Sequence, residues 1–159
     1  MKGHATLMSK ASDEWATPQE FFDVVDRFFA FGLDAAATAQ NTKAECFFVA
    51  EDDSLRQSWC GYGSVWLNPP YSRIAAFMDK AATEAALGAT VVCLVPARTD
   101  TQWWHRTTAK ANEVRLLRGR LKFGDGASSA PFPSALVVFG RHTPHDRAPR
   151  IYNWDWRDR

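Results

Sequence analysis

The feature that most constrains the fold is a short apolar strand that runs directly into two prolines. Residues Ser64 to Leu67 are β-branched, aromatic and apolar, and glycines precede them. Pro69 and Pro70 lack a backbone N–H, so the strand must end before them. A helical pattern begins just afterwards. Open α/β sheets bind ligands outside the carboxyl ends of their strands, so this segment predicts a ligand site in an α/β fold.

The tip Asn68-Pro69-Pro70-Tyr71 carries groups that suit a planar ring bearing an amino function. Asn68 offers an amide oxygen, and the Pro69 carbonyl has no ladder partner. Two such oxygens can accept the N–H bonds of an amino group while the Tyr71 ring covers its face. The alternative is a strand-end turn that Asn68 caps and the prolines stop. The context, between an apolar strand and a helix, favours chemistry.

This tetrad matches the catalytic motif of amino-methyltransferases that use S-adenosylmethionine, and the wider pattern resembles the phage and bacterial DNA N6-adenine methyltransferase family. The resemblance depends on an ordered set of segments: Trp15-Ala16-Thr17-Pro18, Leu33-Asp34-Ala35-Ala36, Asp53-Ser54-Leu55 with Trp59, the tetrad, Leu94-Val95-Pro96-Ala97, and Gly119-Arg120-Leu121-Lys122-Phe123. The set covers about residues 13–140. The tetrad alone is shared with enzymes that methylate RNA bases or protein glutamine, so the ordered set narrows the family.

The resemblance implies methylation of the N6 amino group of adenine in double-stranded DNA, with the target base flipped into a pocket at the tetrad. It implies that the four tetrad residues are catalytic. The residues expected to bind the cofactor are Trp15, Thr17, Pro18, Asp34, Ala35, Asp53 and Asn68. Those expected to bind the substrate are Tyr71, Phe123, Arg98, Arg118, Arg120 and Lys122. Cytosine N4, RNA and protein glutamine stay open as substrates, as does an inactive relative that only binds DNA.

Two acidic positions are expected to meet the cofactor. Asp34 is expected at or just past the end of the first predicted strand, and the amino and sulfonium groups of the cofactor are cationic. Small residues beginning at Ala35 follow it, in place of the usual glycine-rich turn. Asp53 lies nineteen residues later, close to the spacing of a ribose-binding acid. Glu51 and Asp52 remain alternatives for the ribose, and Asp52 or Asp53 can instead cap a short helix.

The predicted elements describe a compact, abbreviated Rossmann-like methyltransferase sheet of the α/β class. It is mostly parallel, with an antiparallel C-terminal hairpin and helices on both faces. The predicted strands cover residues 31–37, 46–49, 64–67, 90–95, 114–117 and 134–139. Only 34 residues lead from Asp34 to Asn68, too few for a full doubly wound half.

Two helix starts carry capping predictions. Thr17 can be the N-cap of the first helix, with Pro18 at its first position and Glu20 closing a capping box. Thr17 can equally lie beside the cofactor, where the family places this segment. Asp100 is predicted to cap the helix that contains Trp103.

The charge of the chain is unevenly distributed. Residues 1–60 carry five Lys and Arg against ten Asp and Glu, whereas residues 61–159 carry fourteen against eight. This asymmetry suggests an acidic end and a basic face, although charge runs are most often solvated surface. Residues 98–122 carry seven Lys and Arg against two Asp and Glu, a surplus suited to phosphate contacts.

The chain divides into a flexible leader at 1–12, a single methyltransferase domain at 13–140 and a basic aromatic tail at 141–159. The tail either reaches DNA by charge and stacking or covers a sheet edge. The three cysteines do not follow metal-site spacing, and methyl transfer from a sulfonium needs no metal. No signal peptide or membrane span is expected, which predicts a cytoplasmic protein of a bacterial or phage-infected cell. The sequence predicts neither oligomeric state nor DNA recognition sequence.

Overall fold

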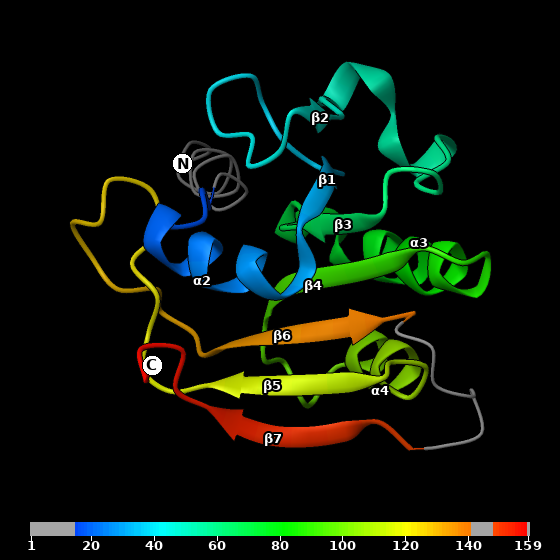
Figure 1. The fold of residues 1–159 in the computed structure, drawn as a ribbon. Coiled ribbons are helices and arrows are strands. Elements are labelled where there is room, and N and C mark those ends of the chain that lie inside the picture. The colour runs from blue at the N-terminus through cyan, green and yellow to red at the C-terminus, as the bar shows by residue number, and fades with distance from the viewer. Residues whose placement is uncertain (1–14, 141–147, 159) are drawn as a thin grey trace, which may run out of the picture.

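A computed structural model describes residues 15–140 and 148–158 of the chain (Figure 1). The predicted leader at 1–12 therefore lies outside the described residues. The α-helices of the described part are α2 (Gln19–Phe29), α3 (Ile74–Ala86) and α4 (Gln102–Thr108). Its strands are β1 (Phe31–Asp34), β2 (Cys46–Phe47), β3 (Ser64–Leu67), β4 (Thr90–Pro96), β5 (Glu113–Leu117), β6 (Ser134–Phe139) and β7 (Arg150–Trp154). Short 3₁₀ helices cover Ala50–Asp52 (η1), Ser54–Arg56 (η2) and Tyr71–Arg73 (η3).

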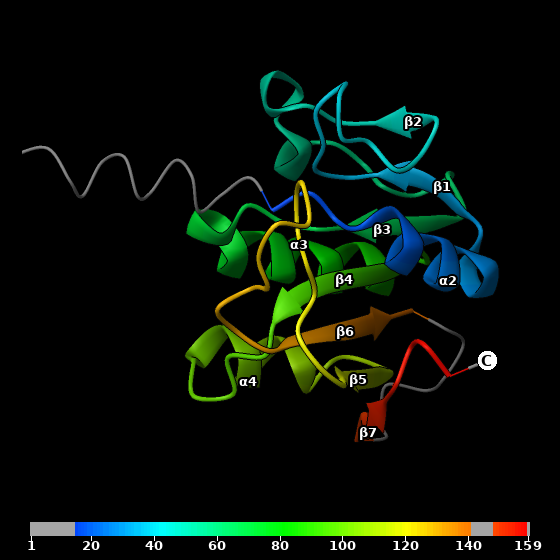
Figure 2. The same cartoon turned by 90° about the vertical axis from the view of Figure 1, so that its left-hand side faces the viewer.

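The strands form one seven-stranded sheet in the order β2-β1-β3-β4-β6-β5-β7. Strand β6 runs antiparallel to its neighbours β4 and β5, and the other pairs in the sheet are parallel. Helix α2 covers one face, and α3 and α4 cover the other (Figures 1 and 2). The prediction of a mostly parallel α/β sheet with an antiparallel hairpin and helices on both faces is confirmed.

Strand β4 is buried on both faces because it lies in the middle of the sheet between two cores. Val91, Cys93 and Val95 belong to the core beneath α3 and α4. Val92 and Leu94 point the opposite way, into the aromatic core beneath α2. Alternating side chains of a strand point to opposite faces, so a strand between two cores must be apolar throughout. Burying one such side chain contributes about 1.5–3 kcal/mol.

The C-terminal segment takes part in the sheet. Strand β7 pairs in parallel with β5, from Arg150 opposite Glu113 to Trp154 opposite Leu117. Beyond the strand, Trp156 is buried and packs edge-on against Phe21 of α2, with 5.3 Å between ring centroids. These residues therefore cover a sheet edge, which was one of the two possibilities that the sequence left open.

Strands β1 and β2 are shorter than predicted because the chain leaves regular pairing at their carboxyl ends. Strand β1 ends at Asp34, although the Ala35 N–H still donates to the Trp66 carbonyl at 2.9 Å. Strand β2 ends at Phe47, and the Phe48 N–H donates to the Asp34 carbonyl at 3.0 Å. Asp34 is thereby held at the carboxyl ends of the strands.

Both capping predictions are wrong. Pro18 occupies the N-cap position of α2, which has no side-chain capping bond, so the capping box of Thr17 and Glu20 does not form. Helix α4 is capped one residue later than predicted, by Thr101 and not Asp100. The Thr101 backbone is extended and its hydroxyl reaches the Trp104 N–H, the third N–H of the helix, as an N-cap side chain must.

Candidate active site

A cavity of about 280 Å³ opens beside the carboxyl ends of β1 and β3. Its wall is built from the segment before α2, the end of β1 with the loop that follows it, residues 48–50 and 53–54, and part of the tetrad. Of the predicted cofactor residues, Pro18 does not line the cavity, and the others do: Trp15, Thr17, Asp34, Ala35, Asp53 and Asn68. The structure thus brings together residues that are up to 53 positions apart in the chain.

Asp34 places a buried carboxyl group on the cavity wall. Its Oδ2 accepts a hydrogen bond from the Lys43 N–H at 2.9 Å, and its Oδ1 accepts one from the Ala36 N–H at 3.4 Å. Burial raises the pKa of Asp34 to about 7, although both N–H groups and the Lys43 charge act in the opposite direction. A cation in the cavity would favour the ionised carboxylate.

Lys43 was missed by the sequence analysis. It lines the cavity near Asp34, and its Nζ donates to Gln19 Oε1 at 2.8 Å. Burial lowers its pKa, partly offset by the charge of Asp34. Lys43 lies in a polar loop, so no periodic pattern marks it.

The acids at 52 and 53 have different surroundings. Asp52 Oδ2 accepts a hydrogen bond from the Val49 N–H at 2.8 Å, which closes the η1 turn. Asp53 has a left-handed backbone with φ of 48°, and its side chain makes no capping bond to η2. Asp53 lines the cavity, whereas Glu51 and Asp52 do not. Asp52 thus serves the local turn, and Asp53 is the acid that faces the cavity.

The amide of Asn68 is bonded through its nitrogen. Nδ2 donates to the Trp15 carbonyl and, at 3.1 Å, to Thr17 Oγ1. The amide oxygen, Oδ1, is buried and has no hydrogen-bond partner among the described residues. A buried carbonyl oxygen without a partner is uncommon and costs free energy. Here it leaves an acceptor beside the cavity.

Tyr71 belongs to an aromatic cluster. Its ring is nearly parallel to that of Trp15, with centroids 6.2 Å apart and an interplanar angle of 18°. Phe132 packs edge-on against Tyr71 at 5.4 Å and against Trp15 at 5.4 Å. The Tyr71 hydroxyl is buried with no partner among the described residues, and burial raises its pKa.

Phe123, expected to bind the substrate, joins this cluster through Trp15 and Phe132. It is buried and contacts Trp15 edge-on at 5.5 Å and Phe132 at 6.2 Å. The rings that contact Tyr71 itself are those of Trp15 and Phe132. Phe132 was missed because it lies in a segment rich in glycine, serine, proline and alanine, which resembles an ordinary loop.

The predicted phosphate-binding cations lie in two places. Arg98 is exposed, and its guanidinium lies 5.9 Å from the centre of the Phe132 ring. Arg120 is exposed and donates to the Ala130 carbonyl at 3.3 Å, and Lys122 is exposed. Arg118 instead pairs with Asp155 at 2.9 Å, beside β7.

The basic surplus of residues 98–122 is therefore not one continuous surface. Arg106 pairs with Asp79 at 2.8 Å, and Arg115 pairs with Glu113 at 2.6 Å. Arg115 is also buried against aromatic rings, the nearest being Trp154 at 5.0 Å. Both arginines are thus held by acidic partners within the protein.

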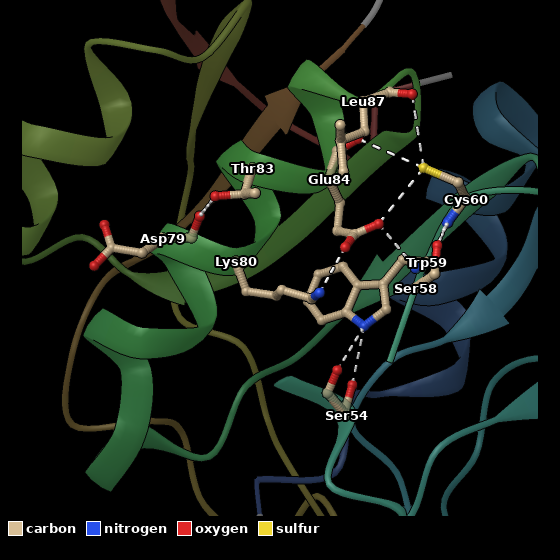
Figure 3. Close-up of polar contacts among 9 residues, drawn as sticks. All are labelled: Ser54, Ser58, Trp59, Cys60, Asp79, Lys80, Thr83, Glu84 and Leu87. Carbon is tan, nitrogen blue, oxygen red and sulfur yellow. Dashed lines mark hydrogen bonds and ion pairs between the residues drawn. The ribbon is translucent and has the colours of Figure 1, made fainter. Parts of the chain in front are cut away.

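Glu84 holds one wall of the cavity in place, and the sequence analysis missed it (Figure 3). Glu84 Oε2 accepts a hydrogen bond from the Trp59 N–H at 2.9 Å, and Oε1 accepts one from Lys80 Nζ. Trp59 Nε1 donates in turn to the carbonyl and hydroxyl of Ser54, each at 3.1 Å. Ser54 lines the cavity next to Asp53. Burial raises the pKa of Glu84, but these hydrogen bonds outweigh it and lower the pKa below its usual value.

The chain is similar over most of its length to known proteins. The family model for DNA N-6-adenine-methyltransferase (Dam) matches residues 4–147. A DNA N-6-adenine-methyltransferase of Haemophilus phage HP1 is 32% identical over 155 residues, covering 91% of this chain and 89% of that protein. A protein of the same name from Escherichia phage T1 is 35% identical over 103 residues, covering 64% of this chain and 43% of that protein. The match thus spans less than half of the T1 protein.

The mixed sheet, with its cavity at the carboxyl edge, is consistent with a methyltransferase-like α/β fold. The match to the family model then identifies the particular family within this fold class. This chain belongs to the DNA N-6-adenine-methyltransferase family, whose enzymes are adenine-specific DNA methyltransferases. The family resemblance expected from the tetrad and the other five segments is confirmed.

Within residues 15–140 and 148–158, no helix is long and apolar enough to cross a membrane. No group of three or more His, Cys, Asp or Glu side chains in these ranges is placed to hold a metal ion. Cys46, Cys60 and Cys93 are free thiols, and Cys93 is buried in β4.

Proposed function

We propose that this chain transfers a methyl group from S-adenosylmethionine to the N6 amino group of adenine in double-stranded DNA. The observation that carries the proposal is the buried, unpaired Oδ1 of Asn68 beside a cavity. Family membership supports adenine in DNA as the substrate, and S-adenosylmethionine as the methyl donor of methyltransferases in general.

The cavity residues fit a cationic nucleoside of this kind. Asp34 would hold the cationic amino and sulfonium end, and Asp53 would hold the ribose hydroxyls. Ala35 has a small side chain that allows close approach. Trp15 and Thr17 would border the methionine part, with Pro18 setting the course of the chain beside them. When bound, S-adenosylmethionine supplies a methyl group that is already activated on sulfur.

The tetrad residues would make the adenine amino group nucleophilic. The lone pair of that nitrogen is delocalised into the ring, which makes it a poor nucleophile. Hydrogen bonds from its N–H groups to Asn68 Oδ1 and the Pro69 carbonyl would draw the nitrogen towards tetrahedral geometry. Pro70 holds the turn rigid after these acceptors. The rate gain then comes from alignment and from acceptors that are already in place, and the surplus proton leaves afterwards to water.

The target base must leave the duplex to reach this site, at a cost of about a few kcal/mol of unstacking. Tyr71 would cover one face of the flipped base, with Phe123 and the rest of the aromatic cluster close by. Exposed Arg98, Arg120 and Lys122 would contact phosphates around it. Arg118 would contribute less, because Asp155 already neutralises it.

The test is product analysis with the purified protein. Wild-type protein is incubated with S-adenosylmethionine and, separately, duplex DNA, RNA and protein, and the products are digested and analysed by mass spectrometry. We expect N6-methyladenine from DNA, and none from Asn68→Ala, which should still bind the cofactor by calorimetry. The control variant is Asn153→Ala, an exposed asparagine on β7. Methylcytosine, methylated RNA or methylglutamine as the product would overturn the proposal, as would unchanged methylation by Asn68→Ala.

A further inference from the structure

We propose that Thr17 is a positioning residue whose hydroxyl, together with the Trp15 carbonyl, holds the Asn68 amide in place so that Oδ1 meets the substrate amino group. This inference rests on the proposed role of Asn68. Thr17 would thus influence the reaction by holding Asn68, and it would not act as a helix cap.

The first step concerns the orientation of the amide. The oxygen and nitrogen of an asparagine amide have nearly the same shape, so a half-turn of the group exchanges an acceptor for a donor. The Trp15 carbonyl can only accept, so it must face Nδ2. Thr17 Oγ1 lies 3.1 Å from the same nitrogen and takes its second N–H. With both N–H groups engaged, the acceptor Oδ1 is the part of the amide that is left for a ligand.

The second step concerns the availability of Thr17. Helix α2 begins at Gln19 with Pro18 as N-cap and no side-chain capping bond, so the helix does not engage the Thr17 hydroxyl. The residue before a proline is restricted to extended backbone, and threonine is stiff at χ1, so its direction is well defined. Thr17 is 5% exposed, and bulk water therefore does not compete for Asn68.

The third step is the consequence for catalysis. Without the Thr17 hydroxyl, the Trp15 carbonyl alone would hold the amide, and the amide plane would be less firmly fixed. A displaced amide places Oδ1 out of line with the N–H groups of the substrate, so that fraction of the enzyme cannot react. The loss should appear in turnover at saturating cofactor, and not in DNA affinity.

The experiment compares Thr17→Val, which keeps the shape and removes the hydroxyl, with Thr17→Ser, which keeps the hydroxyl. At saturating S-adenosylmethionine we expect Thr17→Val to lower kcat roughly tenfold, the size of one buried hydrogen bond, with the KM for DNA unchanged. Thr17→Ser should restore most of the wild-type kcat. Thermal unfolding and calorimetry with S-adenosylmethionine accompany each variant, and Thr17→Ala replaces Thr17→Val if the latter does not fold.

Three results would overturn the inference: an unchanged kcat in Thr17→Val, a kcat in Thr17→Ser as low as in Thr17→Val, or a loss confined to cofactor affinity or thermal stability. Failure of the proposed function looks different. In that case the wild-type protein makes no N6-methyladenine, or Asn68→Ala methylates normally.

Discussion

Two buried polar regions of this protein differ in how their hydrogen bonds are completed. Around Glu84, the Trp59 N–H, the indole Nε1 and the Lys80 ammonium all have partners (Figure 3). Around the tetrad, Asn68 Oδ1, the Tyr71 hydroxyl and Trp15 Nε1 are buried with none among the described residues. Each unpaired group costs about 1–3 kcal/mol, so the second region is arranged at the expense of stability. The region around Glu84 therefore stabilises the fold, whereas the region around the tetrad presents polar groups that a ligand can bind.

The two regions meet at the cavity. Trp59 fixes Ser54 on one wall, while Asn68 forms part of another. A site whose supporting contacts are complete keeps its shape, and an acceptor that is already in place needs no rearrangement during the reaction. Substitutions in the two regions should therefore affect different quantities.

The largest expected effect is on turnover, in Asn68→Ala. Removal of one preorganised hydrogen-bonding group from an active site typically lowers kcat about 100- to 1,000-fold. The variant also removes the two hydrogen bonds that Nδ2 donates to the Trp15 carbonyl and to Thr17 Oγ1, so we expect the free energy of unfolding to fall by about 1–2 kcal/mol. Single-turnover methylation and urea unfolding measure the two quantities, with Asn153→Ala as control. A large loss of stability with normal turnover in Asn68→Ala would contradict the distinction between the two regions.

The next effect is on stability, in Glu84→Ala. The substitution leaves the buried Trp59 N–H and the Lys80 ammonium without their acceptor, and we expect the free energy of unfolding to fall by about 2–3 kcal/mol. Asp79→Ala is the matched control on the same helix, since its ion pair with Arg106 is exposed. Urea unfolding should show little change in the control. An equal change in the free energy of unfolding for Glu84→Ala and Asp79→Ala would contradict a structural role for Glu84.

Cofactor affinity should depend on pH through Asp34. The pKa of about 7 in the protein without ligand means that the carboxyl takes up a proton as the pH falls through 7. A cationic ligand prefers the ionised form, so its affinity should fall roughly tenfold between pH 7.5 and 6, as one-proton linkage requires. Calorimetry across this range should show the slope in wild type and in the control Glu51→Gln, but not in Asp34→Asn. A slope that persists in Asp34→Asn would assign the proton to another group.

The raised pKa of Asp34 also determines how its contribution to the free energy of unfolding changes with pH. Asp34 binds its proton more readily in the folded than in the unfolded chain, whose value is near 3.8. Its contribution to the free energy of unfolding therefore increases as the pH falls from about 7 towards 3.8. Glu84 acts in the opposite direction, because its pKa is lowered and its stabilisation is lost as the pH falls through that value.

The smallest effect is expected from Tyr71→Phe. The variant removes a buried hydroxyl without a described partner and keeps the ring, so the free energy of unfolding should stay unchanged or rise by up to about 1 kcal/mol. Trp59→Phe is the contrast, because it removes a satisfied indole N–H and should destabilise the protein. Urea unfolding of the pair sharpens the comparison, and a clear loss of stability in Tyr71→Phe would show that its hydroxyl has a partner.

The sequence predicted correctly those features that depend on residues close together in the chain. The strand predicted at 64–67 is β3, and Asp34 lies at the end of the first strand, although that strand is shorter than predicted. Contacts between distant segments were not predictable: Thr17 bonds Asn68 across 51 residues, and Glu84 bonds Trp59 across 25. Strand β7 belongs to the segment 141–159, which is predicted to be a tail because it mixes arginines with aromatic residues, and only pairing with β5 makes β7 a strand. Periodicity identifies elements, whereas it does not say which side chains meet.

The most direct test of the central claim is the distance between Asn68 Oδ1 and the N6 atom of the target adenine. It would be measured in a crystal structure of the protein with an S-adenosylmethionine analogue and a DNA duplex. A flipped adenine with its N6 about 3 Å from Oδ1, the length of an ordinary hydrogen bond, is the predicted result. An adenine bound in the site with N6 facing other groups, and Oδ1 still unpaired or bonded within the protein, would contradict the account.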